Sequence, residues 1–215
     1  MSNEPIVDGP ALRLPFDVDD LAADPLRTDR MTLRPLEASD ADDVWEYQRL
    51  PEVLRYIPWP ERTRDEGIEH TRKRADMRRL AADEDAVFLA IELGGEPSTD
   101  PAADGRDRVV GDVMLRLSSA EHARLEIGWV VHPSFQGRGI ATEAARLVLD
   151  FAFEELSPHR VQALLDARNG ASARLCDRLG MRREALILED EFNDGEWQDT
   201  AIHGILRSEW AAARA

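Results

Sequence analysis

The hydrophobic and polar positions along the chain divide it into short strands and longer helices. Apolar residues that alternate with polar ones, or that form short β-branched runs, predict strands at residues 30–36, 86–93, 109–117, 123–132, 160–166, 182–189 and 196–206. Apolar residues spaced three and four positions apart predict helices at residues 39–50, 64–82, 139–156 and 170–179. Strands with helices between them indicate one α/β or α+β domain with a mixed sheet.

Residue types at the ends of these segments mark where they start and stop. Ser39 and Asp40 can cap the first predicted helix, and Pro51 ends it because proline has no N–H to donate. Gly180 closes the last predicted helix, since glycine readily adopts the left-handed conformation of a C-cap. The triplet Asn-Asp-Gly at 193–195 predicts a hairpin turn between the last two strands.

Two segments show little periodicity. Residues 1–27 are rich in proline and aspartate, and we expect a partly ordered N-terminal extension there. Residues 94–108 contain glycine, proline and charged residues, which is typical of a flexible connection between strands. We interpret 94–108 as a surface insertion and not as a domain boundary.

Charge and composition exclude several classes of partner. Acidic residues outnumber basic ones by 43 to 27, and the resulting net charge of −16 repels nucleic acid and attracts cations. No apolar run is as long as a membrane-spanning helix, and the acidic N-terminus is unlike a signal peptide. We therefore expect no nucleic acid partner, no membrane association and a cytoplasmic location.

Cysteine and histidine give no sign of a metal centre. The single cysteine, Cys176, excludes an intrachain disulfide and any cysteine-rich metal site. The 5 histidines follow no HExxH or other ligand spacing. We therefore predict that no metal is bound.

One loop between a predicted strand and a predicted helix has the chemistry of an anion site. Its residues are Gln136, Gly137, Arg138, Gly139, Ile140 and Ala141. The glycines allow close approach of the backbone to a ligand, and the first N–H groups of the following helix lack intrahelical partners. Those donors, the helix dipole and the arginine together could bind a pyrophosphate.

A glycine pair at this place could instead serve only as a tight strand-to-helix turn, because isolated glycine patterns are weak signals. Other phosphate loops do not fit. The loop lacks the Lys-Ser/Thr pair of nucleotide triphosphatases, and it lacks the GxGxxG spacing and acidic partner of dinucleotide-binding enzymes.

The loop matches the Q/R-x-x-G-x-G/A motif that binds the acetyl-CoA pyrophosphate in the GNAT N-acetyltransferases. Further blocks, "TDRMTLRPL", "EIGWVVHPSFQGRGIATEA", "HRVQALLDARNGASARLCDRLGMRRE" and "DGEWQDTAIHGIL", resemble its RimJ/RimL-like branch, the ribosomal-protein-alanine acetyltransferases. The likeness covers residues 28–210. It implies a single-domain GNAT fold with a mixed, mostly antiparallel sheet of six to seven strands flanked by helices.

The resemblance also implies roles for individual residues. Glu126 stands where a glutamate of the family often acts as general base, although a solvated or salt-bridged carboxylate is an equal alternative. The family's strand segment whose backbone pairs with pantetheine and supplies the oxyanion donor corresponds to Trp129, Val130 and Val131.

The helix after the next strand supplies the other implied contacts. Asn169 would hydrogen-bond the pantetheine arm and Ser172 would protonate the leaving thiolate, or both would simply begin the helix. Many relatives place a tyrosine acid where this chain has Cys176, so the acid stays open between Ser172, Cys176 and water. Arg174 could contact the phosphates of the cofactor, or it could equally be an ordinary surface arginine. Tyr56 and Trp59 resemble the family's substrate-lining loop, or form an ordinary hydrophobic plug.

The implied reaction is direct transfer of acetyl from the co-substrate acetyl-CoA to a primary amine. An α-amine is neutral about one time in seven at pH 7 and a lysine amine roughly once in 2,500, so an α-amine needs less help from a base. A protein N-terminus is therefore the first expectation for the acceptor. Polyamines, amino sugars, antibiotics and lysine are the alternatives, and a non-catalytic acyl-CoA sensor is the competing class.

The C-terminal strands could also join two copies into a homodimer. Ile202, Ile205 and Trp210 are the apolar residues that would permit it.

Overall fold

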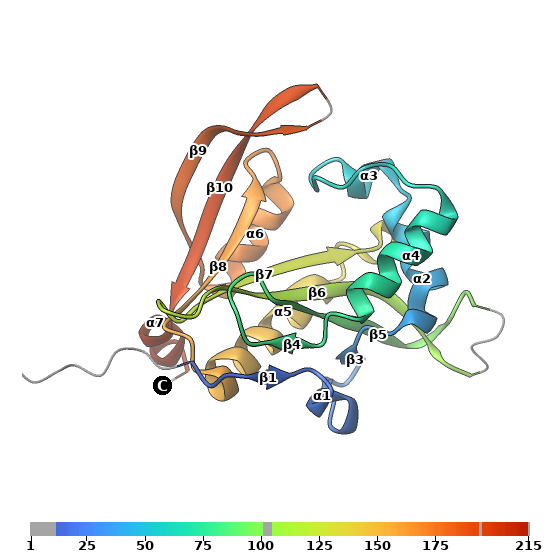
Figure 1. The fold of residues 1–215 in the computed structure, drawn as a ribbon, viewed down its shortest axis with the longest axis horizontal. Helices are drawn as coiled ribbons and strands as arrows, with labels where there is room; N and C mark the ends of the chain where they lie inside the picture. Colours follow the sequence, from blue (N-terminus) through green and yellow to red (C-terminus); the bar gives the residue numbers. More distant parts are fainter. Residues whose placement is uncertain (1–11, 101–104, 194, 215) are drawn as a thin grey trace, which may run out of the picture.

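An eight-stranded sheet forms the centre of the computed structural model, which describes residues 12–100, 105–193 and 195–214 (Figure 1). Its spatial order is β2 (Leu26–Arg27), β3 (Met31–Pro35), β5 (Ala86–Pro97), β6 (Asp107–Ser119), β7 (Arg124–Val131), β8 (Arg160–Asp166), β10 (Glu196–Leu206) and β9 (Arg182–Asn193). Every neighbouring pair is antiparallel except β7 and β8, which are parallel. The predicted mixed, mostly antiparallel sheet is confirmed. It has one strand more than expected, because the short β2 pairs with β3 at the edge.

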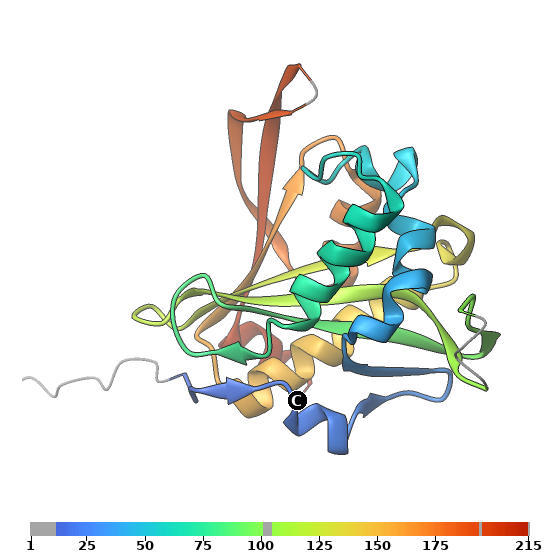
Figure 2. The ribbon, with the colours of Figure 1, turned by 45° about the vertical axis from the view of Figure 1, so that its right-hand side comes forward.

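Helices cover both faces of this sheet (Figure 2). On one face lie α2 (Ala41–Gln48) and α4 (Arg64–Ala75), and on the other α5 (Ile140–Phe151) and α6 (Gly170–Leu179). The shorter helical elements are α1 (Asp20–Ala23), η1 (Ala38–Asp40), α3 (Pro51–Leu54), η2 (Pro133–Phe135), η3 (Ala152–Leu156) and α7 (Arg207–Ala212). The predicted helix 139–156 is thus α5 followed by the π-helical turn η3.

The two faces of the sheet bury separate hydrophobic clusters. Leu125 and Ile127 on β7 point into the larger cluster, which also contains the apolar side of α5. Val130 packs instead against the smaller cluster, where Val44 and Tyr47 of α2 are buried. Each fully buried aliphatic or aromatic side chain contributes about 1.5–3 kcal/mol. Because β7 alternates between the clusters, Glu126, which lies between Leu125 and Ile127, points to the α2 and α4 side.

The parallel strands β7 and β8 separate after a short contact. Their register covers only Arg124 to Glu126 on β7, opposite Arg160 to Gln162 on β8. Beyond that point β7 continues to Val131 and β8 to Asp166 without pairing to each other. The sheet therefore opens into a V at its centre, and the main-chain groups along one edge of β7 are left available to a ligand.

Part of the predicted N-terminal extension belongs to the folded structure. Phe16, on β1 (Phe16–Asp17), pairs with Leu80 on β4 (Arg79–Leu80) in a second, two-stranded sheet. Val18 and Leu21 are also buried in the larger cluster. The pairing explains why the predicted helix 64–82 ends early, at Ala75, because Leu80 is buried as a strand residue. Residues 1–11 lie outside the described residues.

Other boundaries differ in smaller ways. The first predicted helix ends at Gln48, and Pro51 begins α3 instead of ending the helix before it. Asp40 is the N-cap residue of α2, but its side chain accepts from the Glu37 N–H at 2.8 Å, in a capping box that belongs to η1. Asp194 in the predicted hairpin turn lies outside the described residues. In the part of the chain that the structure describes, no helix combines the length and apolarity needed to cross a membrane.

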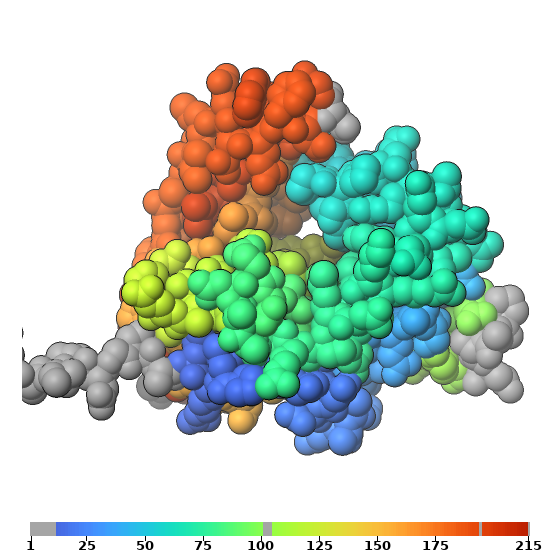
Figure 3. Space-filling view, viewed as in Figure 1, coloured from blue at the N-terminus to red at the C-terminus, as the bar shows by residue number. Residues whose placement is uncertain are grey.

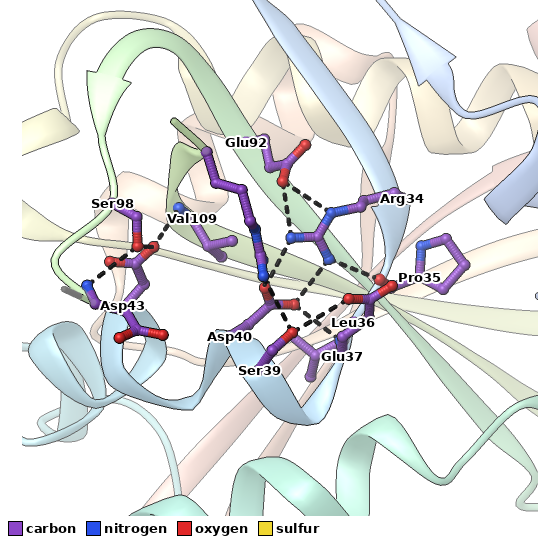
Figure 4. A network of polar contacts seen from close by, with 12 residues as sticks. Arg34, Pro35, Leu36, Glu37, Ser39, Asp40, Asp43, Glu92, Ser98 and Val109 are labelled. Carbon is purple, nitrogen blue, oxygen red and sulfur yellow. Dashed lines mark hydrogen bonds and ion pairs between the residues drawn. The ribbon is translucent and has the colours of Figure 1, made fainter. Parts of the chain in front are cut away.

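The segment 94–108 is in large part a continuation of the β5–β6 hairpin. β5 runs to Pro97, which is opposite Asp107, the first residue of β6. A polar network attaches this hairpin to α2 and η1 (Figure 4). Asp40 accepts hydrogen bonds from Arg34 and lies 2.5 Å from Arg106. Burial alone would lower the pKa of Arg34, but Asp40 and Glu92 outweigh it and raise that pKa.

Asp43 is the second centre of this network (Figure 4). Its carboxylate accepts from the Ser98 hydroxyl at 3.0 Å, from the N–H and hydroxyl of Thr99 at 2.7 and 2.5 Å, and from the Val109 N–H at 3.0 Å. The first residues beyond Pro97 are therefore held against α2 by a buried carboxylate.

We expect Asp43→Ala to lower the free energy of unfolding by about 1–3 kcal/mol, because it leaves the buried Val109 N–H without an acceptor. Denaturant titration measures the change. Asp42→Ala is the matched control, because Asp42 is a half-exposed neighbour whose ion pair is with the exposed Arg64. Equal losses for the two variants would contradict the role of Asp43.

Candidate active site

The loop between β7 and α5 presents free main-chain donors. Gly137 and Gly139 have φ values of 72° and 79°, in the left-handed region that favours glycine. An added Cβ at Gly137 would meet no atom within 4 Å, so the loop is open on that side. The first helical N–H with a main-chain partner here is that of Glu143, which donates to the Gly139 carbonyl at 3.0 Å. The preceding N–H groups of α5 are therefore available for an anion.

A cavity of about 660 Å³ lies in front of these donors. Its walls include predicted site residues from the loop and from both sides of the V: Trp129, Val130, Val131, Gln136, Gly137, Gly139, Ile140, Ala141, Asn169 and Ser172. Arg174 and Arg178 of α6 also line it. We name this cavity the channel.

The side chains of Gln136 and Arg138, two of the predicted loop residues, bind other parts of the protein. The Gln136 amide donates to the Val131 carbonyl at 2.9 Å and so fastens the loop to the end of β7. Arg138 does not line the channel. Its guanidinium lies 3.8 Å from Glu96 and stacks over the Phe135 ring, 5.4 Å from the centroid.

Asn169 and Ser172 combine the two roles weighed for them from the sequence. The Asn169 side-chain oxygen caps α6 by accepting from the Ser172 N–H at 3.0 Å. Both residues nevertheless line the channel. The Trp129 indole N–H donates to the Ser172 hydroxyl oxygen at 3.3 Å, which leaves the hydroxyl hydrogen of Ser172 available to a third group.

A second cavity, of about 450 Å³, lies on the α2 and α4 side of the V. It contains Glu126, and its walls include Trp59, Phe88 and Met114. We name it the acceptor pocket. Figure 3 shows the hollow between the β9–β10 hairpin and the segment around α3 on this side of the molecule.

The two cavities meet at the point where β7 and β8 separate. They share Tyr56, Ile57, Trp129, Val130, Asn169 and Ser172. A molecule lying along the channel and another in the acceptor pocket would therefore come together beside Ser172 and the β7 backbone.

Glu126 is 8% exposed and lies on the floor of the acceptor pocket. Arg116, opposite it on β6, donates to its carboxylate at 2.5 Å. The carboxylate is thus salt-bridged and also lines a cavity. A salt bridge and a role as general base, the two alternatives considered from the sequence, are therefore compatible.

The pocket wall behind Glu126 contains a buried polar group that sequence reasoning missed. Asp112 accepts from the Tyr47 hydroxyl at 2.5 Å and from the Arg74 guanidinium, and all three residues are buried. Burial and the charge of Asp112 raise the pKa of Tyr47 well above its ordinary value, so the phenol stays protonated. The Arg74 guanidinium lies over the Phe88 ring, 4.3 Å from its centroid. Asp112 and Phe88 both line the pocket, so the buried group of Tyr47, Arg74 and Asp112 holds two of its lining side chains in place.

Cys176 is part of the hydrophobic core and lines neither cavity. Burial, with a smaller effect of Asp177, raises the pKa of its thiol to about 12. Of the two side chains considered as proton donors from the sequence, Ser172 lies at the junction of the cavities and Cys176 does not.

Comparison with known proteins decides the family. The family of the acetyltransferase (GNAT) domain matches residues 30–182. The chain belongs to the GNAT acetyltransferase family. A relative from Bacillus subtilis, the uncharacterized N-acetyltransferase YnaD, is 30% identical over 86% of this chain and 98% of its own length. A GNAT-family acetyltransferase from Bacillus anthracis superimposes with a TM-score of 0.71 at 28% identity, covering 85% of this chain and 98% of that one.

The branch within the GNAT family is less defined. The spermidine N(1)-acetyltransferase of Escherichia coli is 24% identical over 84% of this chain and 88% of its own length. The structure of RimL, a ribosomal L7/L12 alpha-N-protein acetyltransferase, in complex with coenzyme A covers 85% of this chain and 98% of RimL, with a TM-score of 0.69 at 14% identity. At that identity it shows the shared fold alone, so the RimJ/RimL branch stays a prediction.

The channel has the features that the GNAT co-substrate acetyl-CoA requires. Its donors at the start of α5 suit a diphosphate, and the cations Arg174 and Arg178 of α6 also line it. Arg178 donates to the Thr142 hydroxyl of α5 at 3.2 Å, which places that cation beside the first turn of the same helix. Within residues 12–100, 105–193 and 195–214 there is no cluster of three or more side chains suited to hold a metal ion.

Proposed function

We propose that this N-acetyltransferase transfers acetyl directly from acetyl-CoA to a primary amine held in the acceptor pocket, without an acyl-enzyme. The observation that carries the proposal is the meeting of the two cavities at Trp129, Val130, Asn169 and Ser172, with Glu126 on the acceptor side. Acetyl-CoA supplies the activated thioester, and the chain's own residues bind, orient and move protons.

Glu126 is the proposed base. Attack of the amine on the thioester carbonyl forms a C–N bond, the C–S bond breaks, and the surplus proton on nitrogen passes to Glu126 directly or through water. The unpaired edge of β7 at Trp129 to Val131 is the proposed donor to the carbonyl oxygen. Ser172 lies at the junction and is the proposed proton donor to the departing thiolate, and it regains a proton from solvent.

The acceptor pocket favours a cation. Its carboxylates are Asp112, Glu126, Asp166, Glu191 and Asp199. Three are neutralised by Arg74, Arg116 and Arg168, respectively. Glu191 and Asp199 form no ion pair with any described residue, and a cation that enters beside them is therefore attracted.

A protein or peptide N-terminal α-amine is the first proposed acceptor. It supports direct transfer because a sizeable fraction is neutral at pH 7. The hollow between the β9–β10 hairpin and α3 leaves room for a chain to enter (Figure 3). A polyamine is the second proposed acceptor. Glu191 and Asp199 suit its additional charges, and a spermidine acetyltransferase is among the relatives.

We predict that a panel of amines, assayed by release of the coenzyme A thiol, separates these acceptors. The panel compares short peptides with free N-termini, the same peptides with blocked N-termini, spermidine, aminoglycosides and lysine. Activity that requires the free N-terminus supports the first acceptor, and activity confined to spermidine supports the second. No release above the rate without acceptor, with acetyl-CoA bound as measured by calorimetry, would contradict the proposed function.

Association into a homodimer and a cytoplasmic location stay predictions. Of the three residues first considered for the dimer, Ile205 is buried and the Trp210 ring stacks on that of Phe153 with centroids 5.1 Å apart, whereas Ile202 is half-buried. The exposed apolar residues of this region are on β8, β9 and β10 instead: Leu164, Leu186, Ile187, Leu188, Phe192 and Trp197. The strand β9 is also an edge of the sheet, with main-chain groups that a second strand could pair with.

A further inference from the structure

Arg116 is held between two carboxylates at the floor of the acceptor pocket. Its Nη2 lies 2.5 Å from Glu126 Oε2, and its Nη1 lies 2.8 Å from Glu84 Oε2. Arg116 and Glu126 are directly opposite each other on β6 and β7, so the contact is fixed by the register of the hairpin. The sequence motifs assign no role to Arg116 or Glu84.

Glu84 has a conformation that favours this contact. Its φ of 72° is unusual for a residue with a side chain. Two hydrogen bonds of 2.8 Å hold the turn: the Glu84 N–H donates to the Leu117 carbonyl, and the Leu117 N–H donates to the Asp85 carbonyl. The Asp85 carboxylate also accepts from the N–H groups of Ala81 and Ala82, which lowers its pKa. A rigid turn therefore presents Glu84 to Arg116.

The three charges form a line from solvent into the pocket. The exposed fraction of the side chain falls from 69% for Glu84 to 30% for Arg116 and 10% for Glu126. Burial alone would lower the pKa of Arg116, but Glu126 and Glu84 outweigh it and raise that pKa. The guanidinium is therefore charged at every pH at which the enzyme would work.

We propose that Arg116 is the positioning residue for the base: it holds the Glu126 carboxylate in place at the pocket floor, and Glu84 moderates its hold by sharing the guanidinium. The proposal rests on the proposed function, in which Glu126 accepts the proton of the amine. An unshared arginine would hold the carboxylate oxygens more tightly and would compete with the proton of the amine for them. Sharing the guanidinium with Glu84 weakens that effect while the geometry is kept.

Other charged groups around Glu126 have their own partners or lie across the pocket. On β6, Asp112 is paired with Arg74, and on β8 the residue opposite Glu126 is the uncharged Gln162. Across the pocket, Asp166 is paired with Arg168. Glu191 and Asp199 on β9 and β10 add negative charge that acts on all variants alike. Arg116 is the cation in direct contact with Glu126.

The test is the pH profile of kcat/KM with one acceptor from the panel, compared among variants. The acceptor's own ionisation is the same in each profile, so a displacement between variants reports on the enzyme. In Arg116→Gln the cation is lost and protonation of Glu126 becomes easier. We expect the acidic limb to move to higher pH by roughly one unit. In Glu84→Gln, Arg116 is no longer shared, and we expect a smaller movement to lower pH, because Glu84 is exposed and screened.

Arg116→Lys separates charge from geometry. It keeps the positive charge but loses the planar fork, so we expect the acidic limb to return toward its original position while kcat stays reduced. Arg27→Gln removes an exposed cation of β2 that lines neither cavity. It is the control for net charge and should leave the profile unchanged.

Opposite displacements in Arg116→Gln and Glu84→Gln support the inference. A fall in kcat at all pH values with no movement of the limb would overturn it, because that result describes a merely structural arginine. If the unaltered enzyme acetylates no amine of the panel, the proposed function fails, and this outcome is seen before any variant is measured. Circular dichroism and acetyl-CoA calorimetry confirm that each variant is folded.

Discussion

Glu126→Gln is expected to lower kcat for amine acetylation by about 10²- to 10⁴-fold, the range typical for loss of a general base. The substitution keeps the size of the side chain and its place on the pocket floor but cannot accept the proton of the amine. Binding of acetyl-CoA should change by less than about twofold, because Glu126 lines the acceptor pocket and not the channel. Steady-state kinetics and calorimetry measure the two effects separately.

The size of this effect also depends on the acceptor. An α-amine is already neutral in a sizeable fraction at pH 7, whereas a polyamine or lysine amine is almost wholly protonated. Loss of the base should therefore cost less with a peptide N-terminus, and the difference should shrink as the pH is raised. The two proposed acceptors can be compared in this way on one variant.

Glu121→Gln is the matched control, because Glu121 is exposed in the turn between β6 and β7 and lines neither cavity. It should keep the activity of the unaltered protein. Retention of more than about a third of kcat by Glu126→Gln between pH 6 and pH 9 would contradict the assignment, because solvent or another group would then be accepting the proton.

The conformation of the loop between β7 and α5 could be predicted from the sequence because it depends on local residues. Two glycines, a helix start and the residues around them fix the conformation of Gly137 and Gly139 over a few positions. The same holds for Asn169, whose capping bond to Ser172 spans three residues. In both places the predicted residues line one channel, with the exception of Arg138.

Features that depend on long-range pairing could not be predicted in the same way. The strand β4 forms only because Phe16 comes to lie opposite Leu80, 64 residues further along the chain. Without that pairing the charged segment after Arg64 simply continues the helical pattern. The polar network of Figure 4 likewise joins residues of β3, α2 and the β5–β6 hairpin.

Charged residues around the site were the hardest to assign. Arg138 belongs to the family motif, yet it is drawn to Glu96 on a neighbouring hairpin, whereas Arg174 and Arg178 line the channel. The position of Arg116 could be inferred from the sequence in one way: a hairpin turn near residues 119–123 places Arg116 opposite Glu126. Only the register of that hairpin, which depends on where the turn falls, identifies the pair.

The second large effect concerns the main-chain donors. Ala141→Pro is expected to weaken binding of acetyl-CoA by roughly 10- to 100-fold, because proline removes one N–H from the start of α5. A hydrogen bond to a charged group is worth about 1.5–3 kcal/mol, and each 1.4 kcal/mol changes affinity tenfold. Proline is tolerated in the first turn of a helix, where this N–H has no intrahelical partner, so the fold should persist.

Asp65→Pro is the control for the backbone change. Asp65 is the second residue of α4, the same position that Ala141 has in α5, and it lines neither cavity. It should leave acetyl-CoA binding unchanged.

Acetyl-pantetheine, which lacks the diphosphate, provides a second comparison: Ala141→Pro should leave its turnover unaffected, because the lost donor faces a group that this molecule does not have. Equal weakening of both ligands would place the defect in the shape of the channel, and unchanged affinity for acetyl-CoA would show that the diphosphate is bound by other groups.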